Sequence, residues 1–300
     1  MKDIALEKLS LPRDQAILKE MDAFVDWNMS THPLSNLIDI SEGGAFVARH
    51  KDRNIGQVFA FPYNEEIGWI AFLVVDPAYR KRGIGRALMD EAINFLSQKG
   101  MKSIGLYATI DGAPLYQKMG FVKNLTSWRF MSEGPKSLTR LKSHFTANFD
   151  FSKVNFVDFS NVNHELFEKV VSLDTTAFGA NRYRIFENRL KMGSWHCITV
   201  VAGDRIDAFG MWRLIDNYFG FIGPIVCADF SLFQILFAKI ALQLIEVAAS
   251  KFYLGTDDAE VSTWMTDLGF SVSERPLLMF LGQVPGFTPQ RRVICHPAKG

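Results

Sequence analysis

The chain has 300 residues, 48% of them hydrophobic and 22% charged, with a formal net charge of +1. This length and composition are typical of a soluble protein with two domains, and the near-neutral charge gives no electrostatic reason to expect nucleic acid or an anionic membrane as a partner. The N-terminus lacks the apolar core of a signal peptide, and Lys239 and Glu246 interrupt the most apolar stretch, residues 230–249. We therefore expect a cytoplasmic protein without a membrane span.

The first half of the chain predicts three strands and then alternating helices and strands. Residues 14–29 favour an amphipathic helix, because apolar and charged residues alternate irregularly there. The helix predicted at 83–98 has Leu88, Ala92 and Leu96 on one face. The other elements are strands at 45–49, 57–63, 67–75, 103–109 and 121–131 and a short helix at 112–119. This order predicts an α/β sheet with helices packed on it.

Residues 133–150 contain Gly134-Pro135 and several polar residues, and they predict a linker between two domains, residues 1–132 and 151–300. The second half repeats the pattern, with helices expected at 163–172, 182–192, 230–250 and 259–267 and strands at 196–202, 206–214, 218–227, 251–256 and 270–281. Aligning Gly120-Phe121 with Gly269-Phe270 superimposes the two halves, so we expect one fold twice.

The cysteines and histidines predict neither a disulfide framework nor a metal site. Cys197, Cys227 and Cys295 are odd in number and far apart, which favours buried, reduced thiols. The six histidines form no HxxxH or HExxH pair, so we expect no metal ion.

One segment carries the strongest chemical signal. Val74-Val75-Asp76-Pro77 ends a strand, and Arg80-Lys81-Arg82-Gly83-Ile84-Gly85-Arg86 opens the following helix. The glycines let the backbone approach a ligand, and the first-turn N–H groups have no partner within the helix. With the helix dipole and four cationic side chains, the turn predicts a pyrophosphate site. A solvated basic turn is the alternative, while the P-loop and dinucleotide motifs do not match.

This segment resembles the acetyl-CoA motif of the GNAT acetyltransferases, R/Q-x-x-G-x-G/A after a strand and an Asp-Pro turn, and residues 80–85 match it fully. The family's second signature is a strand and then a short helix ending in Leu-Tyr-x-x-x-Gly-Phe, which residues 106–109 and 115–121 match. The resemblance covers about residues 1–132. It implies tandem GNAT folds of the α/β (α+β) class, each a mixed, mostly antiparallel sheet flanked by helices, with acetyl-CoA as co-substrate and no metal.

The resemblance also implies residue roles. Backbone groups around Leu73 and Val75 would bind the pantetheine arm where the strand diverges from its neighbour. Tyr116 would protonate the departing CoA thiolate, because a phenol with an ordinary pKa of about 10 is protonated at neutral pH. A core aromatic is the alternative for Tyr116. Thr109 stands where the family often has an asparagine that contacts pantetheine. The implied cofactor-binding residues are Leu73, Val74, Val75, Arg80, Lys81, Arg82, Gly83, Ile84, Gly85, Arg86 and Thr109.

Direct attack on a thioester needs a neutral amine and therefore a general base. Glu65 and Glu66, at the start of the strand at 67–75, are the candidates, and we choose Glu66. A pair of solvated turn carboxylates is the alternative.

In the second half, the counterpart of the phosphate turn carries Asp229 and neither arginine nor glycine, and Met265 replaces Tyr116. We therefore expect no second catalytic site. Residues 174–182 and 220–226 resemble the C-terminal domain of a two-domain GNAT subgroup, which we expect to form a wall of the acceptor pocket. Asp174, Phe178 and Arg182 are the predicted acceptor residues, and local helix capping and packing are the alternative for them.

The motifs together predict an enzyme that transfers the acetyl group of acetyl-CoA to the amine of a small molecule by direct attack. A non-catalytic acyl-CoA sensor and an acetyltransferase that acts on a protein amine are the alternatives. The sequence leaves the acceptor, the acyl length and the oligomeric state open, and a homodimer is compatible with it.

Overall fold

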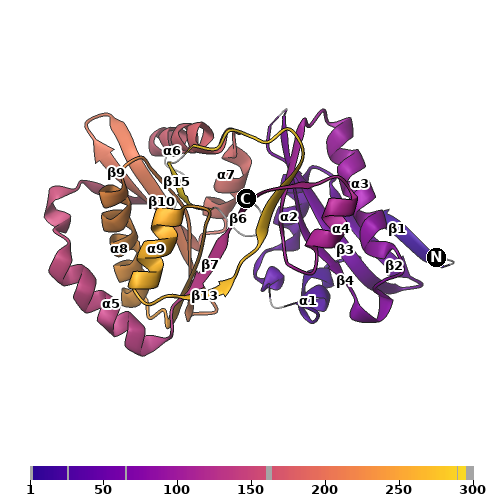
Figure 1. The fold of residues 1–300 in the computed structure, drawn as a ribbon, viewed down its shortest axis with the longest axis horizontal. Helices are drawn as coiled ribbons and strands as arrows, with labels where there is room; N and C mark the ends of the chain where they lie inside the picture. Colours follow the sequence, from indigo (N-terminus) through magenta and orange to yellow (C-terminus); the bar gives the residue numbers. More distant parts are fainter. Residues whose placement is uncertain (1–2, 26, 65, 160–163, 289, 295–300) are drawn as a thin grey trace.

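The computed structural model describes residues 3–25, 27–64, 66–159, 164–288 and 290–294, which form two lobes side by side (Figure 1). In the described part of the chain, the sheet of the N-terminal lobe has seven strands. Their order is β1 (Ile4–Lys8), β2 (Ala45–His50), β3 (Arg53–Pro62), β4 (Ile67–Val75), β5 (Ser103–Ala108), β14 (Leu277–Gly282) and β6 (Val122–Thr126).

The second sheet follows the same plan. Its order is β13 (Ser271–Glu274), β7 (Trp128–Met131), β12 (Lys251–Thr256), β11 (Phe219–Cys227), β10 (Arg205–Ile215), β9 (Trp195–Ala202) and β8 (Phe156–Phe159), with β15 (Arg291–Val293) paired to β11. Both sheets are mixed and mostly antiparallel, because only β4–β5 and β11–β12 pair in parallel among the described strands. Two α/β sheets flanked by helices are the fold class that the sequence predicted.

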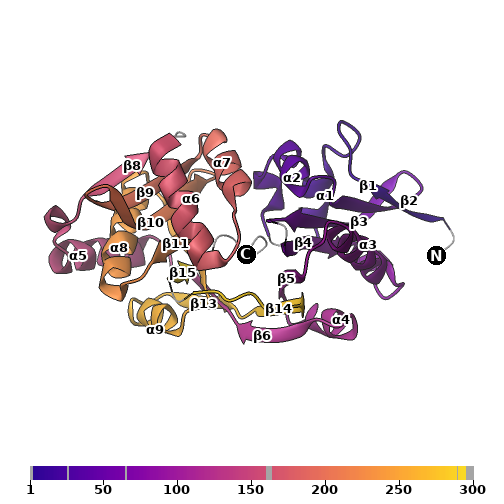
Figure 2. The same cartoon turned by 90° about the horizontal axis from the view of Figure 1, so that it is seen from above.

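Each half contributes one strand to the sheet of the other half. The strand predicted at 121–131 is broken at Ser127 into β6, which stays in the first sheet, and β7, which joins the second. The strand predicted at 270–281 is likewise broken, and β14 lies between β5 and β6. Figure 2 shows β14 beside β6 at the edge of the N-terminal lobe. Because of this exchange, a boundary at residue 132 does not separate the two sheets.

The helices cover the sheets on both faces. They are α1 (Ile17–Asp22), α2 (Leu34–Ser41), α3 (Ile84–Gln98), α4 (Ala113–Lys118), α5 (Pro135–Asn148), α6 (His164–Phe178), α7 (Tyr183–Lys191), α8 (Phe230–Glu246) and α9 (Ala259–Asp267). Along β3, Val58 and Ala60 pack in the cluster under α3, while Phe59 and Phe61 point into a core shared by both lobes. This alternation, with a period of two residues, leaves one apolar face of each sheet for the interface between the lobes.

Several predictions of secondary structure are wrong. The linker predicted at 133–150 contains α5, because Leu138, Leu141 and Phe145 form a buried stripe at helical spacing against α8. The helix predicted at 14–29 is confined to α1, since the chain turns where the Asp22 carboxylate accepts hydrogen bonds from the amides of Met29 and Ser30, at 2.8 and 2.7 Å. The sequence pattern did not predict α2, β1, β8 and β15.

The internal repeat is visible in the backbone. Gly120 and Gly269 have φ values of 91° and 84°, a region that side chains rarely allow. The amide of Phe121 donates to the carbonyl of Tyr116 and the amide of Phe270 to that of Met265, each at 3.0 Å. The alignment proposed from the sequence therefore joins two turns of the same geometry.

Candidate active site

The sheet of the N-terminal lobe opens between two parallel strands. β4 pairs with β5 only from Ile67 to Trp69, and the strands diverge beyond that point. On its other side, β4 shifts register against β3, and Phe72 has a φ of 54° in this bulge. The second half of β4, which contains Leu73 and Val75, therefore has no strand partner on the side of the gap, where the Val75 carbonyl accepts a hydrogen bond from Arg80. This is the divergence that the sequence analysis expected around the predicted pantetheine residues.

The turn after β4 presents free backbone amides. The Asp76 carboxylate accepts a hydrogen bond from the amide of Ala78 at 2.9 Å and forms an ion pair with Arg53 at 2.6 Å. These two contacts hold the Asp-Pro corner in place. Gly83 starts α3 with a φ of 83°, and no side chain caps this helix. Within the described ranges, the amides from residue 81 to residue 86 donate to no protein acceptor. Six consecutive amides at a helix N-terminus form a strong anion site.

The cationic side chains of this turn are exposed around those amides. Arg80 donates through Nε to the carbonyl of Val75 at 3.0 Å, and the Arg82 guanidinium carbon lies 5.3 Å from the centre of the Tyr79 ring. Arg86 lies 3.7 Å from the Asp90 carboxylate, which is a weak surface pair. These side chains can turn toward a phosphate at little cost, so the structure brings the predicted phosphate residues together.

A cavity of about 470 Å³ lies between the lobes at the opening of β4 and β5. Its residues from the N-terminal lobe include Leu73, Thr109 and Tyr116, three of the residues predicted from the sequence. The opposite wall comes from the second sheet and includes Arg129, Met131, Arg213, Phe219, Phe221, Lys251, Tyr253 and Glu274. A predicted cofactor site and a second-lobe wall thus share one cavity, as ligand sites between domains often do.

Tyr116 contributes a phenol to the lining of this cavity. Its ring packs 6.0 Å from that of Phe121, measured between centres, and burial raises the pKa of Tyr116 to about 12. In the part of the chain that the structure describes, its hydroxyl has no hydrogen-bond partner. Thr109 lies beside it, and its hydroxyl accepts a hydrogen bond from the amide of Gly112 at 3.1 Å. The phenol is therefore protonated at neutral pH and free to donate into the cavity.

Glu66 does not line this cavity, so the prediction that it is the general base is wrong. Its carboxylate lies 2.5 Å from Nζ of Lys102 in an exposed ion pair at the other end of β4. The other candidate, Glu65, lies outside the described residues. Of the described residues that line the cavity, Glu274 is the only one with a carboxylate.

Asp174, Phe178 and Arg182 lie outside the cavity that holds Tyr116. Arg182 donates from Nε and Nη2 to the two carboxylate oxygens of Asp174, at 2.9 and 2.6 Å, and both side chains are fully buried. The Arg182 guanidinium carbon stacks 3.8 Å from the centre of the Phe178 ring. This paired and stacked arrangement joins the end of α6 to the start of α7, so packing accounts for these three residues.

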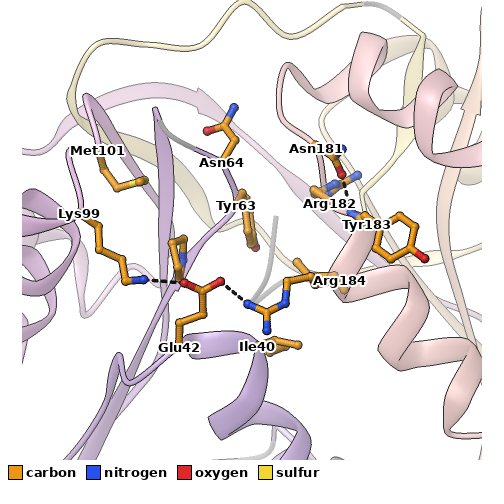
Figure 3. A pocket seen from close by; sticks show the side chains of 12 residues that line it. Ile40, Glu42, Tyr63, Asn64, Lys99, Met101, Asn181, Arg182, Tyr183 and Arg184 are labelled. Carbon is orange, nitrogen blue, oxygen red and sulfur yellow. Dashed lines mark hydrogen bonds and ion pairs between the residues drawn. The ribbon is translucent and has the colours of Figure 1, made fainter. Parts of the chain in front are cut away.

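A second hollow of about 450 Å³ separates the lobes near α2 and α7 (Figure 3). There Glu42 pairs with Lys99 at 2.5 Å and with Arg184, and Arg182 contributes to the lining. None of its described lining residues comes from the opening of β4 or from α4. It therefore lacks the groups that the predicted chemistry requires.

The sequence analysis missed the polar residues of the second-lobe wall. Strand pairing places Met131 opposite Tyr253, Tyr253 opposite Phe221, and Phe221 opposite Arg213, in one row across the sheet. Burial raises the pKa of Tyr253 to about 12. The signal that could have indicated this wall is Arg213, which interrupts the apolar run of β10. Arginine is rarely buried in a strand unless it binds a partner.

The corresponding opening in the second sheet is filled by the chain itself. β11 pairs with β12 only as far as Ile222, and β15 then pairs with β11 on the same side. Asp229 caps α8 by accepting a hydrogen bond from the amide of Leu232 at 2.7 Å, and Arg292 donates to the carbonyl of Ala228 at 2.8 Å. Protein groups therefore occupy both the gap and the turn in the second sheet, where the sequence predicted no second catalytic site.

The cysteines, the possible metal ligands and the helices of the described residues bear on other kinds of function. Cys197 and Cys227 are buried and free, and burial raises the pKa of each thiol, that of Cys227 to about 12, while Cys295 lies outside the described residues. Among the described side chains, no three of His, Cys, Asp or Glu gather where they could hold a metal ion. No described helix has the length and apolar character needed to cross a membrane.

Comparison with known proteins matches each half of the chain to the same class of fold. Residues 14–121 match the model of the acetyltransferase (GNAT) family, and residues 170–292 match that of an acetyltransferase (GNAT) domain. The chain therefore belongs to the GNAT superfamily of acetyltransferases and carries two GNAT domains.

Individual relatives are similar over part of the chain. The chloroplastic GCN5-related N-acetyltransferase 2 of Arabidopsis thaliana is 31% identical over 83 residues, which are 28% of this chain and 32% of the relative. The mycothiol acetyltransferase of Amycolatopsis mediterranei is 29% identical over 104 residues, 30% of this chain and 33% of the relative. The matches thus span about a third of these relatives. The crystal structure of a candidate acetyltransferase from Pyrococcus horikoshii shares the fold, with a TM-score of 0.77 over 100% of this chain and 97% of that one, at 20% identity.

Proposed function

We propose that this protein uses acetyl-CoA to acetylate the amine of a small molecule. One observation carries the proposal: a single cavity contains Tyr116, the end of β4 that does not pair with β5, and polar side chains of the second sheet. The acetyl donor would enter along the free amides that follow β4. The acceptor would then approach from the second lobe.

In the proposed mechanism, the amides from residue 81 to residue 86 bind the pyrophosphate, and the backbone at Leu73 and Val75 binds the pantetheine arm. The acceptor nitrogen attacks the thioester carbonyl, so a C–N bond forms and the C–S bond breaks. Before the attack, Glu274 takes a proton from the ammonium form of the acceptor, directly or through water, and passes it to solvent. Tyr116 gives its proton to the leaving sulfur, and the proton lost by the attacking nitrogen returns to Tyr116 through solvent.

The size of the cavity favours a small acceptor over a protein amine. A space of about 470 Å³ between two lobes is typical of metabolite pockets, whereas a protein side chain needs an open groove. The name of the Amycolatopsis relative, mycothiol acetyltransferase, refers to a small molecule. This supports the proposal without identifying the acceptor.

The test is acetyl-CoA-dependent release of thiol with a panel of amines, amino acids and amino sugars. We expect release with some members of the panel and none without an amine. A protein that binds acetyl-CoA, seen as a rise in melting temperature, but releases no thiol with any amine would be the sensor instead. Thiol release with histone-like or N-terminal peptides alone would favour a protein acceptor.

A further inference from the structure

Arg213 is a buried cation on the wall of the cavity. Its side chain is 4% exposed, and Nη2 donates to the hydroxyl of Thr31 at 2.9 Å. Its Nε is buried without a hydrogen-bond partner, and no carboxylate among the described residues lies within ion-pair distance. A buried guanidinium with free donors is costly, so its retention needs a compensating partner.

Neighbouring charges increase that cost. Arg189 stacks 4.2 Å from the centre of the Trp195 ring, and Arg213 lies 5.2 Å from the same ring. Burial, and then repulsion from Arg189, lower the pKa of Arg213 to about 10, with a smaller opposing effect of Asp216. Arg213 remains charged at neutral pH, in surroundings that favour the arrival of an anion.

Two further cations lie on the same wall. Lys251 is exposed at the cavity, and it forms no ion pair with any described residue. Arg129 also lines the cavity but is fully buried, and its guanidinium carbon lies 4.5 Å from the centre of the Tyr107 ring. Two of its nitrogens, Nε and Nη2, have no hydrogen-bond partner. Glu274 is the one opposing charge among the described lining residues. The second-lobe end of the cavity is therefore positive.

We propose that the acceptor carries an anionic group, a carboxylate or a phosphate, in addition to its amine, and that Arg213 binds this group. The proposal rests on the proposed function and specifies its substrate class. The guanidinium provides the planar donors that both oxyanions accept, and Lys251 adds a point charge at the mouth. With the anion bound to the second lobe, the amine of a short acceptor points toward the opening of β4.

The test compares pairs of amines, of which one member carries the anionic group and the other does not. L-amino acids are compared with their amides, and 2-aminoethyl phosphate is compared with 2-aminoethanol, so that the two arms separate a carboxylate from a phosphate. Thiol release gives kcat and KM. Titration calorimetry on the protein saturated with CoA gives affinity without turnover.

Arg213→Gln should raise KM for the anionic acceptor by roughly 10- to 150-fold, the loss expected for a charge-assisted hydrogen bond. The KM for acetyl-CoA and for uncharged amines should stay within about threefold. Arg213→Lys should recover part of the affinity for the anionic acceptor. It replaces the glutamine variant in the test if that variant does not fold. Arg205→Gln is the matched control, because Arg205 lies on the same strand but is exposed and pairs with Asp207 at 2.6 Å.

Each outcome decides between the two proposals. Equal use of charged and uncharged members of every pair would overturn the anion subsite while leaving the acetyltransferase intact. An equal effect of Arg213→Gln on both members would make the residue structural and also overturn the proposal. If no amine is acetylated, the proposed function fails, but preferential binding of the anionic members to the CoA-loaded protein, lost in Arg213→Gln, would still support the subsite.

Discussion

Replacing Tyr116 by phenylalanine separates its chemical role from a packing role. The substitution removes one hydroxyl, which has no hydrogen-bond partner among the described residues, and keeps the ring against Phe121. The free energy of unfolding should therefore change by less than about 1 kcal/mol. Loss of general acid catalysis should lower kcat by roughly 10²- to 10⁴-fold, or about 3 to 5 kcal/mol of barrier.

The assay is steady-state thiol release together with acetyl-CoA binding by calorimetry. Tyr218→Phe is the control, because Tyr218 lines the same cavity but is 50% exposed and has no assigned role. Since the pKa of Tyr116 is raised to about 12, the wild-type rate should not fall through loss of this proton below about pH 11. A variant that keeps kcat within threefold, or that loses acetyl-CoA affinity instead, would refute the acid role.

The remaining predictions concern the phosphate turn, the buried phenols and the base. The double substitution Arg82→Glu and Gly85→Asp should abolish measurable acetyl-CoA binding. The protein should stay folded, because a Cβ at residue 85 meets only ordinary contacts at 3.7 Å. Unchanged affinity in calorimetry would contradict the pyrophosphate site. In the folded protein the pKa values of Tyr116 and Tyr253 are raised to about 12, whereas an unfolded tyrosine has a pKa of about 10. The stability that these two buried phenols contribute should therefore be complete below pH 10 and be lost as the pH rises to 12. A melting temperature that stays constant over this range would count against their burial. Glu274→Gln should lower kcat about tenfold or more at neutral pH and much less at high pH, where the amine is already neutral; a deficit independent of pH would remove Glu274 from proton transfer.

The local part of the site was predictable from the sequence because its residues are consecutive. A strand, an Asp-Pro corner and a glycine-containing helix start follow each other directly, and the structure keeps them in that order around free amides. The signature around Tyr116 is equally local, since α4 and its closing turn at Gly120 form one unit.

The errors about the site and the strand exchange concern residues that only the folded chain brings together or keeps apart. Glu66 was predicted as the base because it precedes the strand at 67–75. In the structure it lies at the end of β4 that is remote from the cavity, where it pairs with Lys102. Glu274 comes from β13, and nothing near it in the sequence indicates a site. The strand exchange was equally invisible, because only Ser127 separates β6 from β7 and no glycine or proline between them marks a change of sheet.

The superfamily, the repeated fold and the turn that would bind the donor are readable from the chain's motifs, because helix starts and strand ends are set by neighbouring residues. The proposed acceptor wall becomes visible in the folded protein alone. Arg129, Arg213 and Tyr253 meet at one wall because β7, β10 and β12 belong to one sheet, although they are far apart along the chain. Such a wall depends on strand register over long separations, and no local pattern of residues encodes it.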